Sequence, residues 1–260
     1  DQKESQNSIK RIVQDFKPDV VVNLIAIAAT ALDTWKDYLS TNFLISQNIL
    51  EGCAMGPFKP SKFIQVSSAH VYGQIESLSI SEEAPLNPSS AYAKSKTMSD
   101  MLASMYENEF NVIITRPFNY TGVGQNTENF FLPKLIAAAL NKDSEITLGN
   151  INLVRDFSDV RDISSYYRAL IVSDKVTGVI NLCSGKGQLL AEITEEVQRI
   201  SGHYFNIKVN KNLGGGKQST TQIGCNKKLI EITGLAPEYS ISETIQWMLE
   251  NMSFKNRIHK

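Results

Sequence analysis

The residues best suited to chemistry are a tyrosine and a lysine four positions apart, Tyr92 and Lys96. On a helix, side chains with this spacing lie on one face as close neighbours. A lysine ammonium beside a phenol favours the phenolate, so it is expected to lower the pKa of Tyr92 toward neutrality and make it a usable acid or base. Taken alone, the pattern is more typical of a solvated helix face than of a catalytic pair. The surrounding sequence is needed to distinguish the two.

A serine upstream supplies a third group. Ser67 and Ser68 follow a segment, residues 62–66, that is expected to form a buried strand. In an open parallel sheet, ligands bind beyond the carboxyl ends of the strands. Ser68 could there hydrogen-bond a substrate oxygen beside Tyr92. With Lys96, these residues predict proton handling for a carbonyl/alcohol interconversion, and the hydride must come from a cofactor because no side chain supplies one.

Short β-branched segments alternate with segments of helical period along the chain. Such alternation predicts βαβ units and a parallel sheet covered by helices on both faces. The expected strands are residues 20–26, 62–66, 112–115 and 178–182, and the expected helices are residues 9–16, 35–54, 90–107, 130–140, 163–172, 190–200 and 243–251.

Composition excludes several other classes. The 260 residues suffice for one large domain or two small ones. No apolar run approaches the ~18 residues of a membrane span. With 26 basic and 27 acidic residues, the charge argues against a nucleic-acid or membrane surface. Cys53, Cys183 and Cys225 are widely spaced, which argues against a disulfide scaffold or a cysteine metal site and fits a cytoplasmic protein.

Together these motifs resemble the extended short-chain dehydrogenase/reductase family of nucleotide-sugar epimerases, dehydratases and reductases. Ser68, Tyr92 and Lys96 match the family's catalytic Ser/Thr, Tyr and Lys. The segment from Lys17 to Leu24 resembles its fourth strand, and the segment from Arg116 to Gly122 resembles the one that leads to the sugar diphosphate. The resemblance implies NADP(H) or NAD(H) as cofactor. The cofactor-binding residues it implies are Leu24, Ala26, Asn42, Ser67, Tyr92, Lys96 and Pro117.

The resemblance also implies a domain organisation. The fold would be a Rossmann-like, doubly wound parallel sheet with a small C-terminal substrate-binding lobe. Residues 1–117, with about 150–183, would bind the dinucleotide, and residues 118–149 and 184–260 would mainly bind the nucleotide sugar. A homodimer is expected through the helix bearing Tyr92 and the helix before it. The apolar residues compatible with that contact are Met98, Met101, Leu102, Met105 and Tyr106.

One family feature is absent from the sequence. The glycine-rich turn that holds the cofactor pyrophosphate, with its strand and helix, does not occur. The chain begins with Asp1 rather than methionine. We therefore expect it to be a piece of a longer protein. The alternative is a relative that lacks this unit and is catalytically inactive.

The segment around Ser68 narrows the reaction. The family's 4,6-dehydratases carry acidic residues where this chain has Ala69 and His70, which argues against a dehydratase. A 4-ketoreductase or a 4-epimerase remains. His70 would either contact the substrate or only pack and hydrogen-bond locally.

The segment from Leu148 to Val160 resembles the GDP-hexose branch of the family, especially reductases of GDP-4-keto-6-deoxy-mannose. The resemblance implies that Arg155 clamps the diphosphate, since a guanidinium fork suits phosphate oxygens. The alternative is a surface pair of Arg155 with Asp156 or Asp159. The implied substrate-binding residues are His70, Asn119, Lys134, Leu148, Arg155 and, in place of the usual arginine, Lys217.

The predicted function is NAD(P)H-dependent reduction of the 4-keto group of a GDP-4-keto-6-deoxy-hexose. Tyr92 would protonate the developing alkoxide, Lys96 would bind the nicotinamide ribose, and Ser68 would position the carbonyl. The product would be a GDP-6-deoxy-hexose of the rhamnose or talose type. The alternatives are a nucleotide-sugar 4-epimerase and a nucleotide-sugar-binding relative without catalysis.

Overall fold

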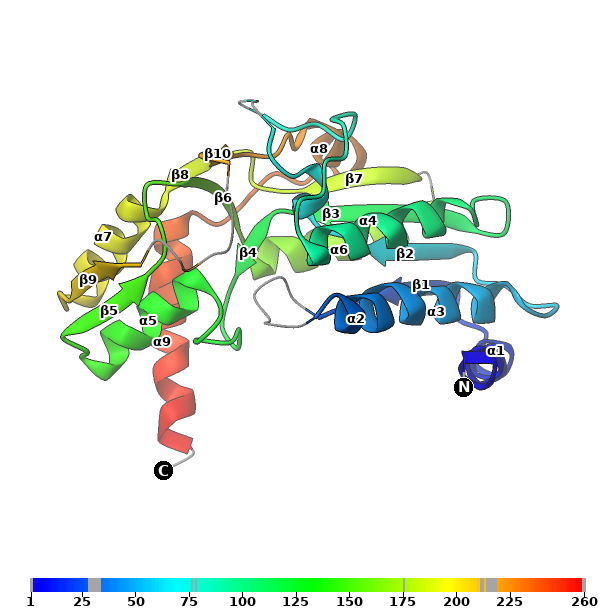
Figure 1. Ribbon diagram of the computed structural model, residues 1–260, viewed down its shortest axis with the longest axis horizontal. Coiled ribbons are helices and arrows are strands. Elements are labelled where there is room, and N and C mark those ends of the chain that lie inside the picture. The colour runs from blue at the N-terminus through cyan, green and yellow to red at the C-terminus, as the bar shows by residue number, and fades with distance from the viewer. Residues whose placement is uncertain are drawn as a thin grey trace.

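The computed structural model describes residues 2–27, 34–75, 77, 79–174, 176–210, 213 and 219–258, and of residues 2 and 253–258 only the backbone. Helices and strands alternate along the chain, so the protein is α/β as expected (Figure 1). Within these ranges, no helix has both the length and the apolar character needed to cross a bilayer. Nor do three or more His, Cys, Asp or Glu side chains of the described residues gather as a potential metal site.

The main sheet consists of parallel strands in the order β1-β2-β3-β7. Each forms from one of the β-branched segments that the sequence marks as a strand. Their bounds are β1 Val20–Asn23, β2 Lys62–Val66, β3 Asn111–Pro117 and β7 Gly178–Leu182. Because every pairing is parallel, the carboxyl ends of all these strands meet at one edge of the sheet.

Helices cover both faces of this sheet. On one face, Phe63 of β2 packs in a core with Val13 of α1 (Gln2–Phe16), Leu50 of α3 (Ile45–Ala54) and Ala103 of α4 (Ala91–Ser104). On the other, Ile64 packs with residues of α6 (Val160–Val172) and α8 (Lys227–Thr233). Successive side chains of a strand point to opposite faces, so the neighbours Phe63 and Ile64 of β2 enter different cores.

The predicted helix over residues 35–54 is not a regular α-helix. It consists of α2 (Trp35–Tyr38), a π-helical segment η1 (Leu39–Leu44) and α3. Thr34 begins it with a capping box, in which Asp37 completes the reciprocal bonds. Short π-helical segments are frequent at functional sites. Here the segment carries Asn42 into a fully buried position.

The second part of the chain forms two smaller sheets. In one, β10, β6 and β4 lie side by side, with β8 paired to β6; in the other, β5 pairs with β9. Their bounds are β4 Asn119–Thr121, β5 Glu145–Leu148, β6 Val154–Asp159, β8 Gly187–Leu189, β9 Asn206–Val209 and β10 Thr221–Gln222. Helices α5 (Phe131–Asn141), α7 (Leu190–Ser201) and α9 (Ile241–Ile258) pack with them.

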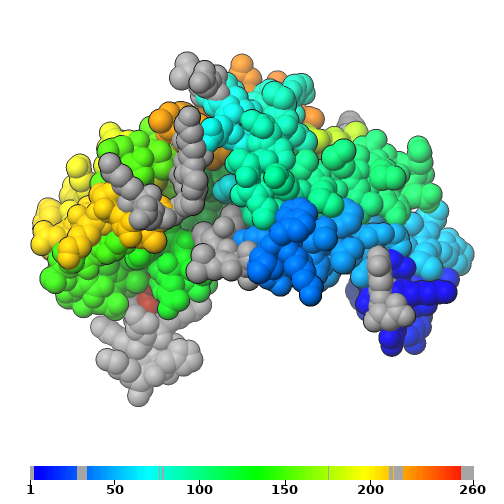
Figure 2. All heavy atoms as spheres, in the orientation of Figure 1, coloured from blue at the N-terminus to red at the C-terminus, as the bar shows by residue number. Residues whose placement is uncertain are grey.

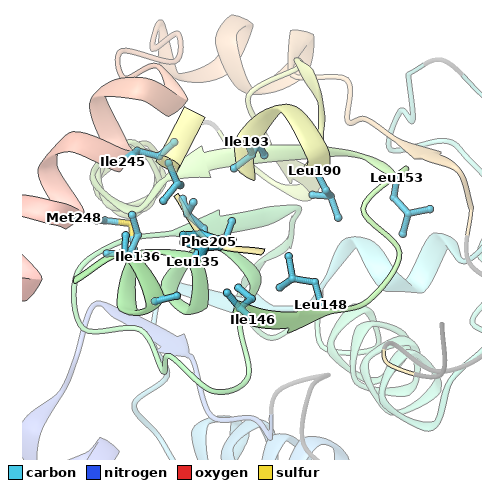
Figure 3. Packing of buried hydrophobic residues seen from close by; sticks show 14 residues of the cluster. Leu135, Ile136, Ile146, Leu148, Leu153, Leu190, Ile193, Phe205, Ile245 and Met248 are labelled. Atoms are coloured by element: carbon cyan, nitrogen blue, oxygen red, sulfur yellow. The ribbon is translucent and has the colours of Figure 1, made fainter. Parts of the chain in front are cut away.

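This second part has its own hydrophobic core. Leu135 and Ile136 of α5 meet Ile193 of α7, Met248 of α9 and Phe205 before β9 (Figure 3). Figure 2 shows the two parts by colour, with the early residues in blue gathered at one end and residues of about 130–150 in green and 190–210 in yellow at the other. The short strand β4, directly after β3, leads the chain from the main sheet to this second part (Figure 1).

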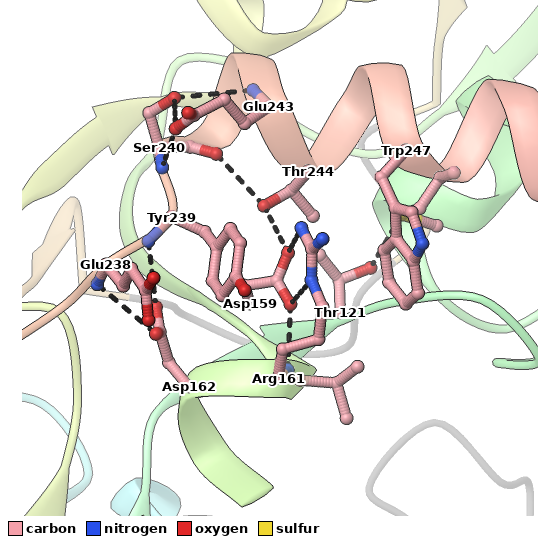
Figure 4. A network of polar contacts seen from close by, with 12 residues as sticks. Thr121, Asp159, Arg161, Asp162, Glu238, Tyr239, Ser240, Glu243, Thr244 and Trp247 are labelled. Carbon is pink, nitrogen blue, oxygen red and sulfur yellow. Dashed lines mark hydrogen bonds and ion pairs between the residues drawn. The ribbon is translucent and has the colours of Figure 1, made fainter. Parts of the chain in front are cut away.

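An arginine between two aromatic rings ties α6 to α9. Asp159 caps α6 and receives two side-chain hydrogen bonds from Arg161, at 2.9 and 2.7 Å, and one from Thr244 of α9 at 2.7 Å. The Arg161 guanidinium lies 3.7 Å from the ring centroid of Tyr239 and 4.2 Å from that of Trp247 (Figure 4). Such charge–ring contacts add to the ion pair. The network fixes α9 on the strand that carries Arg155.

Candidate active site

A cavity of about 490 Å³ lies beyond the carboxyl ends of the main sheet. Its walls come from the ends of β1, β2 and β3, from α4, and from the strands β4 and β6 of the second part. This is the place where parallel α/β sheets bind ligands. The residues predicted from sequence that line it are Leu24, Ala26, Ser67, Ser68, His70, Tyr92, Lys96, Pro117, Asn119 and Arg155.

Ser68 begins the turn that follows β2. Its Oγ accepts a hydrogen bond from the His70 backbone N–H at 3.2 Å and so caps the short 3₁₀ helix η2 (Ala69–Tyr72). Gly73 ends this helix at φ 64°, where a Cβ atom would lie 1.8 Å from the Asn87 carbonyl oxygen. Only glycine fits there. This tight turn keeps the Ser68 hydroxyl at the cavity.

Tyr92 lies in the first turn of α4, which Ser90 caps by accepting from the Ala93 N–H. Its ring is flanked edge-on by those of Tyr38 and His70, with centroids 5.9 and 5.6 Å away. Burial raises the pKa of Tyr92 to about 12, and a hydrogen bond with Ser68 offsets part of that rise. The phenol is therefore protonated at neutral pH.

The expectation that Lys96 brings the pKa of Tyr92 toward neutrality is wrong for this structure. Lys96 is 2% exposed, and its ammonium donates to the Val66 carbonyl oxygen at 2.7 Å. Burial lowers the pKa of Lys96 to about 8. The charge of Asp100, which lies one helical turn after Lys96, offsets part of this fall. The desolvation of Tyr92 outweighs any benefit from its neighbour, because a buried phenolate is costly.

A buried polar network lies behind this face of α4. Tyr92, Lys96 and Asp100 are spaced four residues apart, so they share one face of the helix. Asp100 accepts from Arg116 of β3 at 3.2 Å, and both side chains are more than nine-tenths buried. Arg116 also donates to the Tyr72 hydroxyl at 3.1 Å. Burial raises the pKa of Asp100 to about 6 while Ser67 and Arg116 lower it, so the carboxylate is still charged at neutral pH.

Asn42, predicted to lie near the cofactor, does not line the cavity. Its amide accepts from the Ile27 N–H at 2.8 Å and donates to Ser95 Oγ at 3.0 Å. Ile27 follows β1, and Ser95 precedes Lys96 on α4. Asn42 therefore holds the segment after β1 against the catalytic helix, and the π-helical η1 carries it to this position.

Arg155 and Asn119 reach the cavity from the second part of the chain. Arg155 and Phe157 alternate with Asp156 along β6, so the first two face the cavity and Asp156 points away. Asp156 accepts from the backbone N–H groups of Ser184 and Gly185 at 2.9 and 3.0 Å, which fixes the strand. The predicted alternative, a surface pair of Arg155 with Asp156 or Asp159, does not form: Asp159 pairs with Arg161.

Two of the predicted substrate residues lie elsewhere. The Lys134 ammonium donates a hydrogen bond to the Thr147 carbonyl oxygen at 2.8 Å and so connects α5 to β5. Leu148 is 3% exposed and belongs to the core of the second part. Neither lines the cavity, although Pro133 and Gly149 beside them do. Lys217 lies outside the described residues.

His70 lies in η2, two residues after Ser68, and lines the cavity. Its Nδ1 is 3.0 Å from Ser68 Oγ, and its ring is exposed on one side. Burial of the rest of the ring, and the nearby charge of Arg155, lower the pKa of His70. The imidazole is therefore neutral at neutral pH. Of the two sequence interpretations, local hydrogen bonding is seen, and the ring still lines the cavity.

Several cavity residues escape sequence reasoning. Tyr120 and Gln125 follow Asn119 and line the same wall, and Gln222 of β10 lies opposite Arg155 in the strand register. Alternation along β4 would have placed Tyr120 on the opposite face from Asn119, yet both line the cavity. Gln222 gives no periodic signal, because its strand has only two residues and pairs with a segment far away in sequence.

A parallel α/β sheet with a cavity at the carboxyl ends of its strands is typical of enzymes that bind dinucleotides. Comparison with known proteins identifies the family. Residues 3–183 match the NAD dependent epimerase/dehydratase family, so the chain belongs to it. It is similar to GDP-6-deoxy-D-talose 4-dehydrogenase of Aggregatibacter actinomycetemcomitans, with 29% identity over 96% of this chain and 84% of that protein. It is also similar to GDP-6-deoxy-D-mannose reductase of Pseudomonas aeruginosa, with 28% identity over 92% of this chain and 82% of the relative.

Solved structures agree on the fold. RMD from Pseudomonas aeruginosa, complexed with NADPH, superposes with a TM-score of 0.83 at 28% identity, over 92% of this chain and 82% of that one. UDP-glucuronic acid 4-epimerase from Bacillus cereus gives 0.86 at 23% identity, over 95% and 78%. The fold is thus Rossmann-like, as the sequence resemblance implied, and the chain is an NAD(P)-dependent enzyme.

The cavity fits the nicotinamide end of NAD(P). Leu24 and Ala26 after β1, with Pro117 at the end of β3, form an apolar wall suited to a planar ring. Tyr92 and Lys96 line the same cavity, where a hydroxyl and an amine would hydrogen-bond the hydroxyl groups of a ribose. When bound, NAD(P)H supplies a hydride.

Proposed function

We propose that the protein reduces the 4-keto group of a GDP-4-keto-6-deoxy-hexose to a GDP-6-deoxy-hexose with NAD(P)H. The observation that carries this proposal is the protonated phenol of Tyr92, held beside the Ser68 hydroxyl in the cavity. Reduction of a ketone needs a proton donor, and a phenol whose pKa is about 12 is a donor at neutral pH. The reverse oxidation would need the phenolate.

The chain's own residues have separate tasks in this step. Ser68 positions the carbonyl oxygen by a hydrogen bond. Tyr92 transfers its proton to that oxygen as the hydride reaches C4, so that no free alkoxide forms. Lys96 stays cationic below about pH 8 and favours the negative charge left on Tyr92.

The substrate class follows from the wall of the cavity that faces the main sheet and from the relatives. Arg155 and Asn119 supply donors at the wall opposite the main sheet, where they would bind the diphosphate and hexose. The GDP-sugar specificity of two relatives supports guanine as the base. His70 in place of a carboxylate supports reduction over dehydration. Lys134 and Leu148 make their contacts away from the cavity and are not proposed as substrate contacts. Lys217, which lies outside the described residues, would add positive charge near the nucleotide.

We also propose a division of the chain and a dimer. Residues 1–117, with about 150–183, would hold the cofactor, and residues 118–149 and 184–260 would hold most of the nucleotide sugar. The dimer contact would be the outer face of α4. Met101 and Met105 are 64% and 76% exposed on it, whereas Leu102 and Tyr106 pack partly against the core.

A 4-epimerase is the second candidate, because similar proteins include UDP-glucose 4-epimerases. It would use the same Ser68, Tyr92 and Lys96. The test is incubation of the protein, expressed from its complete reading frame, with GDP-4-keto-6-deoxy-mannose and NADPH or NADH. We expect one nicotinamide oxidised per ketone reduced. Turnover of an NDP-hexose without added reductant, and none of the ketone, would contradict the reductase.

A further inference from the structure

The turn that carries Ser68 is connected to the main sheet by the side chain of Tyr72. Tyr72 is the last residue of η2, the 3₁₀ helix that Ser68 begins, and it is fully buried. Its hydroxyl accepts a hydrogen bond from Arg116 Nη1 at 3.1 Å and donates one to Asn181 Oδ1 at 2.7 Å. Burial raises the pKa of Tyr72 to about 12, so the hydroxyl keeps the proton that it donates.

The two partners of this hydroxyl are neighbours on the main sheet. Arg116 and Asn181 lie opposite each other in the parallel register of β3 and β7, so their side chains point to the same face. One presents an N–H donor and the other a carbonyl acceptor to the same phenol. A tyrosine hydroxyl can donate and accept at once, which suits it to this position. The Asn181 amide also donates to the Ile80 carbonyl oxygen at 3.0 Å, which keeps its own oxygen toward Tyr72.

The same arginine contacts the helix that carries Tyr92. Arg116 Nε lies 3.2 Å from Asp100 Oδ2. Asp100 belongs to α4 and follows Lys96 by one helical turn and Tyr92 by two. The guanidinium therefore connects the turn after β2 with α4. Ser68 and Tyr92 come from these two separate elements, yet in ketone reduction they have to act on one carbonyl oxygen.

We propose that Tyr72 is a positioning residue, which holds Ser68 in place against Tyr92. The inference rests on the proposed function, in which Ser68 binds the ketone oxygen while Tyr92 protonates it. Tyr72 does not line the cavity, so its effect on the reaction has to pass through Ser68. A displacement of about 1 Å in an active site can cost ~10²-fold in rate.

The ring of Tyr72 and its hydroxyl have separate tasks. The ring packs in a core with Ile80 and Phe118, and the centroids of the Tyr72 and Phe118 rings are 6.4 Å apart. A phenylalanine would fill the same space. It would leave Asn181 Oδ1 without its donor and Arg116 with one hydrogen bond fewer, and both side chains are buried. Removal of the hydroxyl alone therefore tests positioning without emptying the core.

The test measures reduction of GDP-4-keto-6-deoxy-mannose by Tyr72→Phe, by Ser68→Ala and by the double variant. We expect Tyr72→Phe to lower kcat by ~10–10²-fold, with the KM for the nicotinamide cofactor unchanged. In the Ser68→Ala background the same substitution should leave kcat unchanged, because no Ser68 hydroxyl remains to be positioned. Two independent effects would instead multiply.

Tyr166→Phe is the matched control. Tyr166 is also buried, and its hydroxyl has no hydrogen-bond partner among the residues that the structure describes. Loss of that hydroxyl should leave kcat unchanged. Asn181→Ser is a second variant, which removes the acceptor of the Tyr72 hydroxyl from the other side. It should lower kcat in the same way, so the positioning role stays testable if Tyr72→Phe folds poorly.

Two results would overturn the positioning role and leave the reductase intact. One is an unchanged kcat in both Tyr72→Phe and Asn181→Ser. The other is an equal loss of kcat from Tyr72→Phe with and without the Ser68 hydroxyl, which a general loss of structure would produce. A natural protein that reduces no such ketone would overturn the proposed function, and the positioning role with it.

Discussion

At the scale of residues, burial sets the protonation states of the groups in the cavity. It raises the pKa of Tyr92 to about 12 and lowers that of Lys96 to about 8. Both shifts follow from desolvation, which favours the neutral form of each group. An acid that stays protonated and a base that stays charged only below about pH 8 suit reduction of a ketone near neutrality.

The first prediction concerns pH. Because the pKa of Lys96 is lowered from 10.5 to about 8, the ammonium loses its proton as the pH rises through about 8, while Tyr92 remains a phenol. We expect kcat/KM for reduction to fall above about pH 8. In Lys96→Arg, whose guanidinium remains charged, the fall should move to higher pH. An identical alkaline limb in both proteins would contradict this assignment.

The second prediction concerns the ion pair behind Lys96. Arg116→Met leaves Asp100 buried without its cation and should lower the free energy of unfolding by ~3–5 kcal/mol at neutral pH. Without Arg116 the folded pKa of Asp100 rises further above about 6, so the variant should regain stability as the pH falls and the carboxyl is protonated. Urea unfolding at several pH values measures both effects.

Arg199→Met is the control for that experiment. Arg199 pairs with Glu196 on the surface, where the guanidinium is 66% exposed. Such pairs contribute little, so its unfolding midpoint should stay near that of the natural protein. Equal losses in the two variants would show that burial of the Arg116–Asp100 pair is not what matters.

The proposed catalytic residues could be selected from the sequence, but their pKa shifts could not be predicted from it. Helical spacing and the strand before Ser68 are enough to bring Ser68, Tyr92 and Lys96 to one place. The shift of the Tyr92 pKa depends on rings and backbone from distant segments, such as Tyr38. The positions of Lys134 and Leu148 also depend on tertiary packing, which a motif does not specify.

At the scale of elements, apolar patterning predicted the main sheet and its helices. The strands expected at residues 62–66 and 178–182 have those bounds in the structure, and most helices begin or end within a few residues of the prediction. The strands β4, β5, β6, β8, β9 and β10 were not predicted. They are short and mostly only partly buried, so hydrophobic periodicity gives little signal.

The third prediction concerns the cap of α6. Asp159→Ala removes the cap and also the partner of Arg161 (Figure 4). Loss of a cap alone costs ~0.5–2 kcal/mol, and we expect a larger loss here. Ser90→Ala removes only the cap of α4 and serves as the comparison. Equal unfolding free energies of the two variants would contradict a stabilising role of the Arg161 network.

Acid should weaken the same network. Burial alone would raise the pKa of Asp159, but hydrogen bonds from Arg161 and Thr244 bring it below its ordinary value. A carboxyl with a lowered folded pKa stabilises the protein above its unfolded pKa of ~3.9, and this contribution disappears as the pH falls through the folded value. The stability difference between natural protein and Asp159→Ala should therefore shrink in acid.

At the scale of the whole molecule, the cavity lies where two separately packed cores meet. One part supplies Tyr92, Lys96 and the strand ends, and the other supplies Arg155. Interfaces between such parts are common places for ligand sites. The chemistry therefore depends on the segment through β4 and on the Arg161 network, which hold the two parts in register.

The fourth prediction concerns assembly. If the outer face of α4 forms the dimer, Met101→Asp with Met105→Asp should convert the protein to a monomer at micromolar concentration, because both exposed side chains would place charges in an apolar contact. Ile12→Asp with Phe16→Asp on α1 is the control, since these residues are also exposed. Sedimentation shows the outcome, and an unchanged mass of the α4 variant would rule out this face.

The most direct measurement of the central claim is the rate of ketone reduction by Tyr92→Phe. Tyr106→Phe, which removes a phenol just after the same helix, is the control. With GDP-4-keto-6-deoxy-mannose and NADPH or NADH, we predict that Tyr92→Phe loses ~10²–10⁴ in kcat while Tyr106→Phe keeps it. Undiminished hydride transfer in Tyr92→Phe would contradict the assignment of Tyr92 as the proton donor.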